Sequence, residues 1–253
     1  MKALILAAGT GTRLQPLTDH TPKALVKAGN YSLLEIVIRR LAGAGFKSLV
    51  INVHHFPEQI VDFLRSNNNF GLDIGISDES GELLDTGGAI KKAVPFFEGE
   101  EDVLVHNIDI LTNLNYQDLI DYHKKNDALI TLAVKNRATS RSLIVDASGR
   151  LCGWEYPEKK LCILTRENRK GLKTIAFSGV YVLSTRIFEK FPMENVFGFT
   201  PWILDLAAKE KILTWDQSPA FWYEAGRIDS LEMASRSVIF DENDPAFISE
   251  NIG

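Results

Sequence analysis

The stretch Met1–Val26, MKALILAAGTGTRLQPLTDHTPKALV, decides the fold. Lys2–Ala7 is an apolar run with the length and branching of a buried strand. It is followed at once by Ala8–Arg13, a segment of small residues that cannot fill a core and is called the glycine loop below. Glycines let the backbone approach a ligand closely, and successive N–H groups can point at phosphate oxygens. The stretch therefore predicts a strand that ends in a phosphate-binding loop.

Two cations follow the loop. Arg13 offers a planar fork that matches phosphate oxygens, and Lys23 offers a mobile point charge. Pro16 and Pro22 stiffen the connection and keep it from becoming a helix. Strand, loop and spaced cations together indicate a site for a nucleoside triphosphate. A tight strand-to-helix turn without a ligand is the alternative for the glycine loop taken alone.

The two best-known phosphate motifs are excluded. Leu14 stands where a dinucleotide fingerprint needs its third glycine, and no Gly-Lys-Ser/Thr follows as in a P-loop. The net charge of −5 argues against a nucleic-acid partner. Cys152 and Cys162 are too few and wrongly spaced for a disulfide framework or a zinc site. No apolar run approaches the ~20 residues of a membrane helix, so we expect a cytoplasmic protein. We also expect a monomer or small homo-oligomer whose partners are small-molecule substrates.

Strands and helices alternate along the first half. We expect strands at 2–7, 48–53, 72–77 and 102–106, and helices at 33–45, 57–65 and 87–97 that start at Ser32, Pro57 and Thr86. This alternation predicts a doubly wound, mostly parallel (Rossmann-like) α/β sheet. Right-handed crossovers would bring the carboxyl ends of the strands to one edge, where ligands bind.

The second half has a less regular pattern. We expect a helix at 115–126, strands at 128–134 and 175–183, a hairpin within 141–155 and a charged loop at 156–173. Further helices should start at Ser184, Thr200 and Asp229. No linker or repeat interrupts the chain, which predicts a single domain over residues 1–253 with two lobes.

Two carboxylates are candidates to hold Mg²⁺ beside the phosphates. Asp109 follows directly from the predicted strand at 102–106, and Glu224 ends an aromatic run, AFWYEAG. The alternative for each is a helix cap or a surface carboxylate.

The string L-A-A-G-x-G-T-R-L-x-P-L-T, followed by P-K-A-L-V, resembles the signature of the sugar-1-phosphate nucleotidylyltransferases. Among them it is most similar to the short bacterial N-acetylmuramate-1-phosphate uridylyltransferases. The resemblance implies their fold, with a nucleotide-binding half over 1–112 and a smaller sugar-binding lobe within 113–253. It also implies Mg²⁺ and a product that is a nucleotide sugar, such as a cell wall or polysaccharide precursor.

The same resemblance implies metal ligands. Asn107-Ile108-Asp109 matches the family's Asn-Gly-Asp except at its middle residue, and Asp109 would bind Mg²⁺. The family's W-x-D-x-G-T-P corresponds to Trp222–Ile228, which keeps the Trp and Gly, has Glu in place of Asp and lacks the Thr-Pro; the resemblance makes Glu224 the second ligand. Ile108 puts a branched side chain where the family keeps open space beside the nucleotide.

The remaining site residues also come from the resemblance. Leu84–Ile90 is similar to the family's E-T-G-G-G-I, where Gly87 and Gly88 would offer close backbone approach and free amides at a helix start. The nucleotide-binding set is Leu6, Ala7, Ala8, Gly9, Gly11, Thr12, Asp85, Gly87, Gly88 and Asn107. The sugar-binding set is Glu155, Ser178 and Gly179, and the catalytic cations are Arg13 and Lys23.

The implied reaction is attack of a sugar-1-phosphate oxygen on the α-phosphorus of the nucleotide, with pyrophosphate leaving. The Ala-Ala-Gly opening favours UTP, and N-acetylmuramate 1-phosphate is the leading acceptor. A guanylyltransferase that makes GDP-mannose or a GDP-heptose is the alternative in the same class. A nucleotide-sugar sensor without turnover is the alternative from another class, because Ile108 and Glu224 depart from the family pattern.

Overall fold

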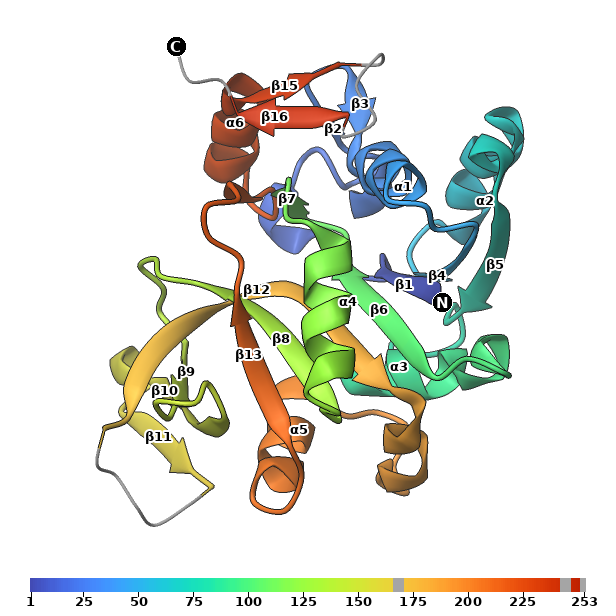
Figure 1. Ribbon diagram of the computed structural model, residues 1–253. Helices are drawn as coiled ribbons and strands as arrows, with labels where there is room; N and C mark the ends of the chain where they lie inside the picture. The colour runs from blue at the N-terminus through green and yellow to red at the C-terminus, as the bar shows by residue number, and fades with distance from the viewer. Residues whose placement is uncertain (166–170, 242–246, 251–253) are drawn as a thin grey trace.

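A computed structural model of the protein describes residues 1–165, 171–241 and 247–250. Four parallel strands form one side of its main sheet, in the order β5-β4-β1-β6, with β5 at the edge. They are β1 (Lys2–Leu6), β4 (Ser48–Val53), β5 (Asp73–Asp78) and β6 (Asp102–Asn107). The predicted parallel, Rossmann-like core is confirmed (Figure 1).

Beyond β6 the sheet becomes mixed. The long strand β12 (Lys173–Ser184) runs antiparallel to β6, and it pairs with β8 (Ile130–Lys135) along one part and with β9 (Ser142–Val145) along another. The other members are β13 (Ile212–Asp216), β10 (Leu151–Tyr156) and β11 (Leu161–Leu164). β9 and β10 form the predicted hairpin. The prediction of a loop over 156–173 is wrong for Leu161–Leu164, which form β11. Residues 166–170 of that predicted loop lie outside the described residues.

Helices cover both faces of the sheet, which explains the apolar strands. Ile5 packs in a cluster with residues of α1 (Leu33–Gly43), α2 (Pro57–Ser66) and α4 (Tyr116–Lys125). Its neighbour Leu4 points to the other face, into a cluster with residues of α3 (Asp85–Ala93) and α5 (Phe199–Ala207). Strands buried on both faces carry continuous rather than alternating apolar runs.

The predicted helix starts have mixed outcomes. Ser32 accepts a hydrogen bond from the Glu35 amide, and Pro57 is the first residue of α2, as expected. Thr86 does not cap α3, which begins one residue earlier without a side-chain cap. Asp229 does not cap α6 (Ile228–Ser237) either, because it lies inside the first turn and accepts from the Ser230 amide.

The two remaining starts are displaced or shortened. Thr200 lies within α5, which begins at Phe199 after Gly198. Ser184 precedes only a 3-10 turn at Thr185–Lys190. Neither start has a capping side chain.

Three short two-stranded ribbons complete the described structure. They pair β2 (Lys27–Ala28) with β3 (Tyr31–Ser32), β7 (Ile110–Thr112) with β14 (Trp222–Glu224), and β15 (Val238–Phe240) with β16 (Ile248–Glu250). α6 and the β15–β16 ribbon lie against the β2–β3 ribbon, so the C-terminal part of the chain returns to its N-terminal part (Figure 1).

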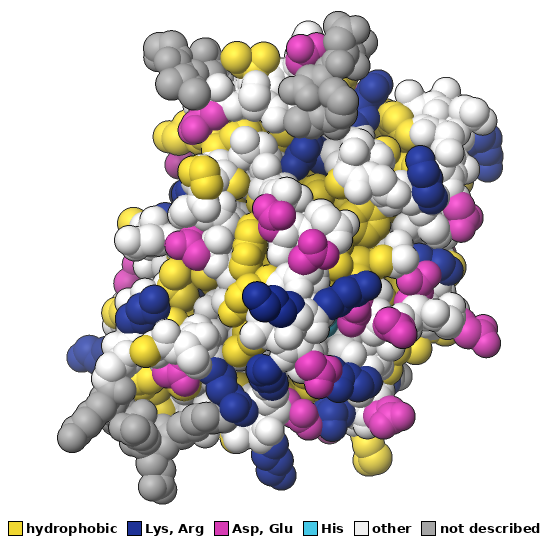
Figure 2. Space-filling view, in the orientation of Figure 1, with side chains coloured by type: hydrophobic (Ala, Val, Ile, Leu, Met, Phe, Trp, Pro, Cys, Tyr) yellow, Lys and Arg dark blue, Asp and Glu magenta, His cyan; other side chains and the backbone are white. Residues whose placement is uncertain are grey.

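The surface shows no dominant charge on the face in Figure 2, where acidic and basic side chains of the described residues are interspersed. This mixture fits the modest net charge of −5 and gives nucleic acid no basic face here. None of the helices in the described part of the chain is long and apolar enough to cross a membrane.

Candidate active site

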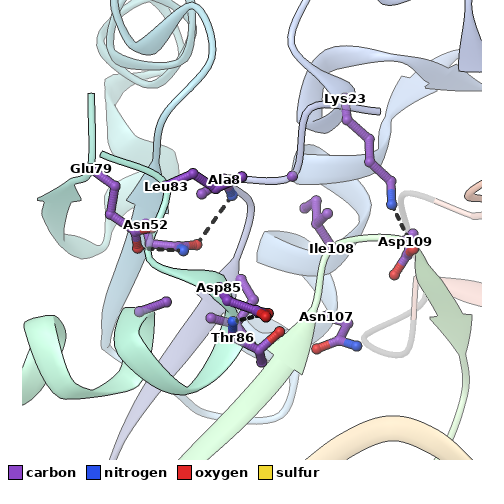
Figure 3. Close-up of a pocket in the computed structure, with 13 residues that line it drawn as sticks. Ala8, Lys23, Asn52, Glu79, Leu83, Asp85, Thr86, Asn107, Ile108 and Asp109 are labelled. Atoms are coloured by element: carbon purple, nitrogen blue, oxygen red, sulfur yellow. Dashed lines mark hydrogen bonds and ion pairs between the residues drawn. The ribbon is translucent and has the colours of Figure 1, made fainter. Parts of the chain in front are cut away.

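A cavity of about 370 Å³ lies where β1, β4 and β6 end, at the predicted edge of the sheet. Seven of the residues that line it were expected from the sequence: Leu6, Ala8, Gly9, Lys23, Asp85, Asn107 and Asp109. Six were not proposed as ligand contacts: Asn52, Glu79, Leu83, Thr86, Ala89 and Ile108. Figure 3 shows the labelled side chains converging from β4, β6, the glycine loop and the start of α3.

The glycine loop has the backbone that its sequence requires. Gly11 has a φ of 68°, and a Cβ there would lie 2.8 Å from Thr18 Cγ2. The Thr18 hydroxyl donates to the Gly11 carbonyl at 2.9 Å and fixes the turn. Beside Gly9, the nearest atom to an added Cβ is Lys23 Cδ at 4.0 Å, so its face is open to the cavity. Thr12 and Arg13 follow in a 3-10 turn, Thr12–Leu14.

Lys23 and Asp109 meet at the mouth of this cavity. Lys23 lies in a 3-10 turn, Lys23–Leu25, and Asp109 follows β6. Their Nζ and Oδ2 atoms are 2.6 Å apart, and both side chains are largely buried (Figure 3). The pair is a charge-assisted hydrogen bond that brings the predicted phosphate-binding lysine to the predicted metal-binding carboxylate.

Glu224 reaches the same place from the far end of the chain. β14 pairs with β7 so that Glu224 lies opposite Ile110, and the Ala225 amide donates to the Asp109 carbonyl at 2.7 Å. The carboxylate accepts from Arg13 Nη2 at 3.2 Å. A Cβ on Gly226 would lie 2.9 Å from Glu224 Oε1, 3.0 Å from Asp109 Oδ2 and 3.2 Å from Arg13 Nη2. Two carboxylates and a guanidinium therefore surround one point.

This arrangement fits a magnesium ion. Mg²⁺ in phosphoryl-transfer sites is usually held by one or two carboxylates, with waters and substrate phosphates as its other ligands. Asp109 and Glu224 supply those two carboxylates within reach of a common point. Among the described residues there is no group of three or more His, Cys, Asp or Glu side chains that could hold a metal ion without other ligands.

Asn52 and Glu79 are hydrogen-bonded to each other in the wall of the cavity, and neither was predicted from the sequence. Asn52 Oδ1 accepts from the amides of Ala7 and Ala8 at 2.5 and 3.3 Å, which fixes the entry to the glycine loop. Its Nδ2 donates to Glu79 Oε1 at 2.8 Å. Glu79 is fully buried, and this burial raises the pKa of its carboxyl. An asparagine inside the apolar run SLVINV is a signal that could have identified Asn52, whereas Glu79 stands in a polar segment.

Gly87 and Gly88 do not offer the free amides expected at a helix start. Both amides donate to the Phe197 carbonyl, at 3.0 and 3.2 Å. A Cβ on Gly87 would lie 2.3 Å from the Phe197 ring, and one on Gly88 would lie 2.0 Å from the Asn195 carbonyl oxygen. These glycines make room for segment 195–197. Their contact with a nucleotide stays a prediction, whereas Asp85 lines the cavity with a φ of 58°.

Ser178 and Gly179 lie beside the carboxylates. They stand where β12 shifts its register against β8, between Phe177 and Tyr181. The Ser178 carbonyl accepts from Trp222 Nε1 at 2.9 Å. A Cβ on Gly179, whose φ is 77°, would lie 2.7 Å from Ile110 Cγ1 and 3.1 Å from Asn107 Nδ2. The bulge thus contacts the last residue of β6, Asn107, and the first residue of β14, Trp222.

Glu155 and Ile108 complete the predicted set. Glu155 lies on β10 between Ser142 and Cys162, and no hydrogen bond or ion pair in the described part of the chain connects it to the other site residues. Its role stays a prediction. Ile108 is 2% exposed and packs in the cluster that contains Ile5, while it also lines the cavity (Figure 3).

Comparisons with known proteins match most of the chain. A family model described as nucleotidyl transferase matches residues 2–239. The mannose-1-phosphate guanyltransferase of Yarrowia lipolytica is 30% identical over 231 residues, which cover 90% of this chain but only 61% of that protein. The N-acetylmuramate alpha-1-phosphate uridylyltransferase of Neisseria meningitidis is 30% identical over 241 residues, which cover 92% of this chain and 96% of that protein.

Solved structures support the fold. The crystal structure of HddC from Yersinia pseudotuberculosis superimposes with a TM-score of 0.74 at 24% identity, over 93% of this chain and 98% of that one. At this identity the similarity concerns the arrangement of helices and strands.

Proposed function

This chain belongs to the nucleotidyl transferase family, and we propose that it transfers a nucleotidyl group from a nucleoside triphosphate to a sugar 1-phosphate. The observation that carries this proposal is the convergence of Asp109, Glu224, Lys23 and Arg13 at the mouth of the glycine-loop cavity. Phosphoryl transfer needs positioning and charge stabilisation rather than a protein nucleophile, and these groups are of that kind.

The proposed reaction is one in-line displacement. A phosphate oxygen of the sugar 1-phosphate bonds to the α-phosphorus, and the bond from that phosphorus to the bridging oxygen breaks as pyrophosphate leaves. Arg13 neutralises charge on the β- and γ-phosphates, and Lys23 steadies the α-phosphoryl group or the incoming phosphate. Asp109 and Glu224 would hold Mg²⁺, which supplies positive charge to the phosphates when bound.

UTP and N-acetylmuramate 1-phosphate are the proposed substrates. The Neisseria relative, which carries that name, extends over almost the same length as this chain. We accordingly propose that the enzyme works in the cytoplasm on a precursor of the cell wall or of a polysaccharide. The Yarrowia relative favours one alternative, a guanylyltransferase that acts on mannose 1-phosphate or a related sugar phosphate.

The decisive experiment measures pyrophosphate release with Mg²⁺ across four nucleoside triphosphates and a panel of sugar 1-phosphates. Release with UTP and an amino-sugar phosphate supports the first proposal, and release with GTP and a mannose or heptose phosphate supports the alternative. Asp109→Asn is the matched control, because it removes the charge of the proposed metal ligand and keeps its size. Folded protein that binds nucleotide but releases nothing with any pair would refute the enzymatic proposal and favour a sensor.

A further inference from the structure

A second arginine stands beside the proposed metal carboxylates. Arg137 follows β8, and its guanidinium carbon lies 3.6 Å from the centroid of the Trp222 ring. Trp222 precedes Glu224 by two residues on β14 and donates to the Ser178 carbonyl. Arg137 therefore lies between the β12 bulge and the strand that carries Glu224.

The hydrogen bonds of Arg137 leave donors unused. Nη2 donates to the Phe177 carbonyl at 2.8 Å, and Nη1 donates to the Ala138 carbonyl at 3.2 Å. Nε is buried and has no hydrogen-bond partner in the described part of the protein. A guanidinium has five N–H donors, and a buried donor without an acceptor costs free energy. The two carbonyls fix the plane of the group without completing its hydrogen bonding.

The charge of Arg137 is also only weakly compensated. Among the described residues it forms no ion pair, and the carboxylate that acts on it is Glu224, which is already hydrogen-bonded to Arg13. Desolvation lowers the pKa of Arg137, although the guanidinium stays charged. A partly buried cation without a counter-ion is destabilising in the free protein, and an anionic ligand removes this cost.

The location indicates which substrate supplies the anion. The glycine loop and Arg13 lie on the nucleotide side, whereas Arg137 bonds to Phe177, next to the Ser178–Gly179 bulge proposed for the sugar. The N–H donors that the Phe177 and Ala138 carbonyls leave unused are the groups that an oxyanion of the acceptor would bind.

We propose that Arg137 binds an anionic oxygen group of the acceptor, either its 1-phosphate or a carboxylate on its sugar ring. Both groups are oxyanions that a guanidinium fork recognises in the same way. This inference rests on the proposed function. It makes Arg137 a specificity-determining residue for acidic acceptors if the partner is the carboxylate, and a general acceptor-binding residue if the partner is the phosphate.

Direct binding tests the proposal without turnover. Titration calorimetry compares wild type, Arg137→Met and Arg137→Lys with two probes: glucose 1-phosphate, which has the phosphate alone, and N-acetylmuramic acid, which has the carboxylate alone. Loss of a charge-assisted hydrogen bond should weaken binding roughly 10- to 100-fold in Arg137→Met. Arg137→Lys should lose less, because it keeps the charge and lacks the fork. Arg236→Met, an exposed change on α6, is the control and should bind both probes as wild type does.

The two arms identify the anion. Weakened binding of glucose 1-phosphate assigns Arg137 to the phosphate, and weakened binding of N-acetylmuramic acid assigns it to the carboxylate. Unchanged affinity for both probes, or binding of neither probe by wild type, would overturn the proposal.

Thermal unfolding separates a ligand-binding role from a structural one. Arg137→Met removes a partly buried cation but also its hydrogen bonds to the Phe177 and Ala138 carbonyls, so we expect only a small change in melting temperature. A marked fall in both variants would mean that Arg137 only supports Trp222, which contradicts the proposal. If no substrate pair released pyrophosphate, the enzymatic function would be refuted but this proposal would not. Calorimetry would still show whether Arg137→Met binds the anionic probes more weakly than wild type does.

Discussion

At the scale of single residues, each proposed ligand of the metal is paired with a cation. Lys23 bonds to Asp109, and Arg13 bonds to Glu224. The second pair is the more exposed, with 57% of the Arg13 side chain accessible, so it contributes little to folding. Its conformational freedom suits a group that turns from a carboxylate to a phosphate when substrate binds.

Arg13→Ala should therefore lower kcat about 10²- to 10³-fold, as removal of one transition-state donor does, with almost no effect on stability. The measurements are steady-state pyrophosphate release and thermal unfolding. Arg65→Ala is the control, since Arg65 is exposed and pairs with Asp62 on the surface of α2. Turnover of Arg13→Ala close to that of wild type would show that Arg13 has no catalytic role.

Gly226→Ala should disturb the proposed metal site while the protein still folds. The new Cβ would lie within 3.2 Å of the side chains of Asp109, Glu224 and Arg13, whose ends can move, so the protein should still fold. Displaced carboxylates should weaken Mg²⁺ binding and reduce kcat on the order of 10²-fold. Gly81→Ala is the matched control because nothing lies within 4 Å of its Cβ. A Mg²⁺ dependence identical to that of wild type would refute the position of the metal.

His106 makes stability depend on pH. It is buried beside Asn107, and desolvation lowers its pKa from 6.5 to about 4. Between these values the unfolded chain binds a proton that the folded chain does not, so stability falls as the pH drops from 6.5 to about 4. His106→Gln should abolish a contribution of about 3 kcal/mol over this range. Denaturant unfolding at several pH values measures it, and a pH-independent difference between the two proteins would contradict the assignment.

Candidate residues were predictable where a charged side chain directly follows a recognisable local pattern. Lys23 and Asp109 follow a proline and an apolar strand respectively, and both line the cavity as expected. Asn52, Glu79 and Arg137 were missed because their importance lies in partners far along the chain: Ala7 for Asn52, Asn52 for Glu79 and Trp222 for Arg137. Apart from the asparagine inside the apolar run SLVINV, no local pattern points to these pairings.

At the scale of elements, the β7–β14 ribbon positions the two carboxylates of the proposed metal site. It brings Asp109, just before β7, to Glu224 at the end of β14. Thr112 supports the ribbon, since its hydroxyl donates to the Phe221 carbonyl at 2.6 Å and accepts from the Leu114 amide at 3.2 Å. The registry of this short ribbon thus fixes the distance between the two carboxylates.

Thr112→Val keeps the shape of this buried side chain and removes both hydrogen bonds. It should reduce the free energy of unfolding by about 1–3 kcal/mol, because a buried carbonyl and a buried amide lose their partner. It should also raise the Mg²⁺ concentration needed for half-maximal activity, since Glu224 moves with β14. Thr174→Val, at an exposed position of β12, is the control. A loss of stability with unchanged Mg²⁺ dependence would mean that the ribbon does not position the site.

Long elements were predictable and short ones were not. The six-residue apolar strand β4 and the helix α1 with its Ser32 cap were predicted because their patterns are strong over many residues. β7, β15 and β16 have three residues each, too few for any periodicity. β13 was missed although it is largely buried, because its five residues, ILTWD, are too few to show a clear alternation.

At the scale of the whole molecule, the two halves of the chain share one core. The apolar cluster on the α1 side contains Ile5 and Leu34 from the first half and Phe221, Ala225 and Leu231 from the second. The main sheet is continuous across the boundary, because β12 pairs with β6. The sequence suggested a single domain from the absence of a linker, and the shared cluster gives that prediction a physical reason.

A shared core implies that the two halves unfold together. All four tryptophans, Trp154, Trp202, Trp215 and Trp222, lie in the second half, so their fluorescence reports mainly on residues 113–253. Far-UV circular dichroism reports on helices and strands of both halves. We expect both signals to change at the same denaturant concentration, since coincident transitions mark a single cooperative unit. A fluorescence midpoint distinct from the dichroism midpoint would show that residues 1–112 keep their structure without the second half, and that the nucleotide and sugar lobes are separate domains.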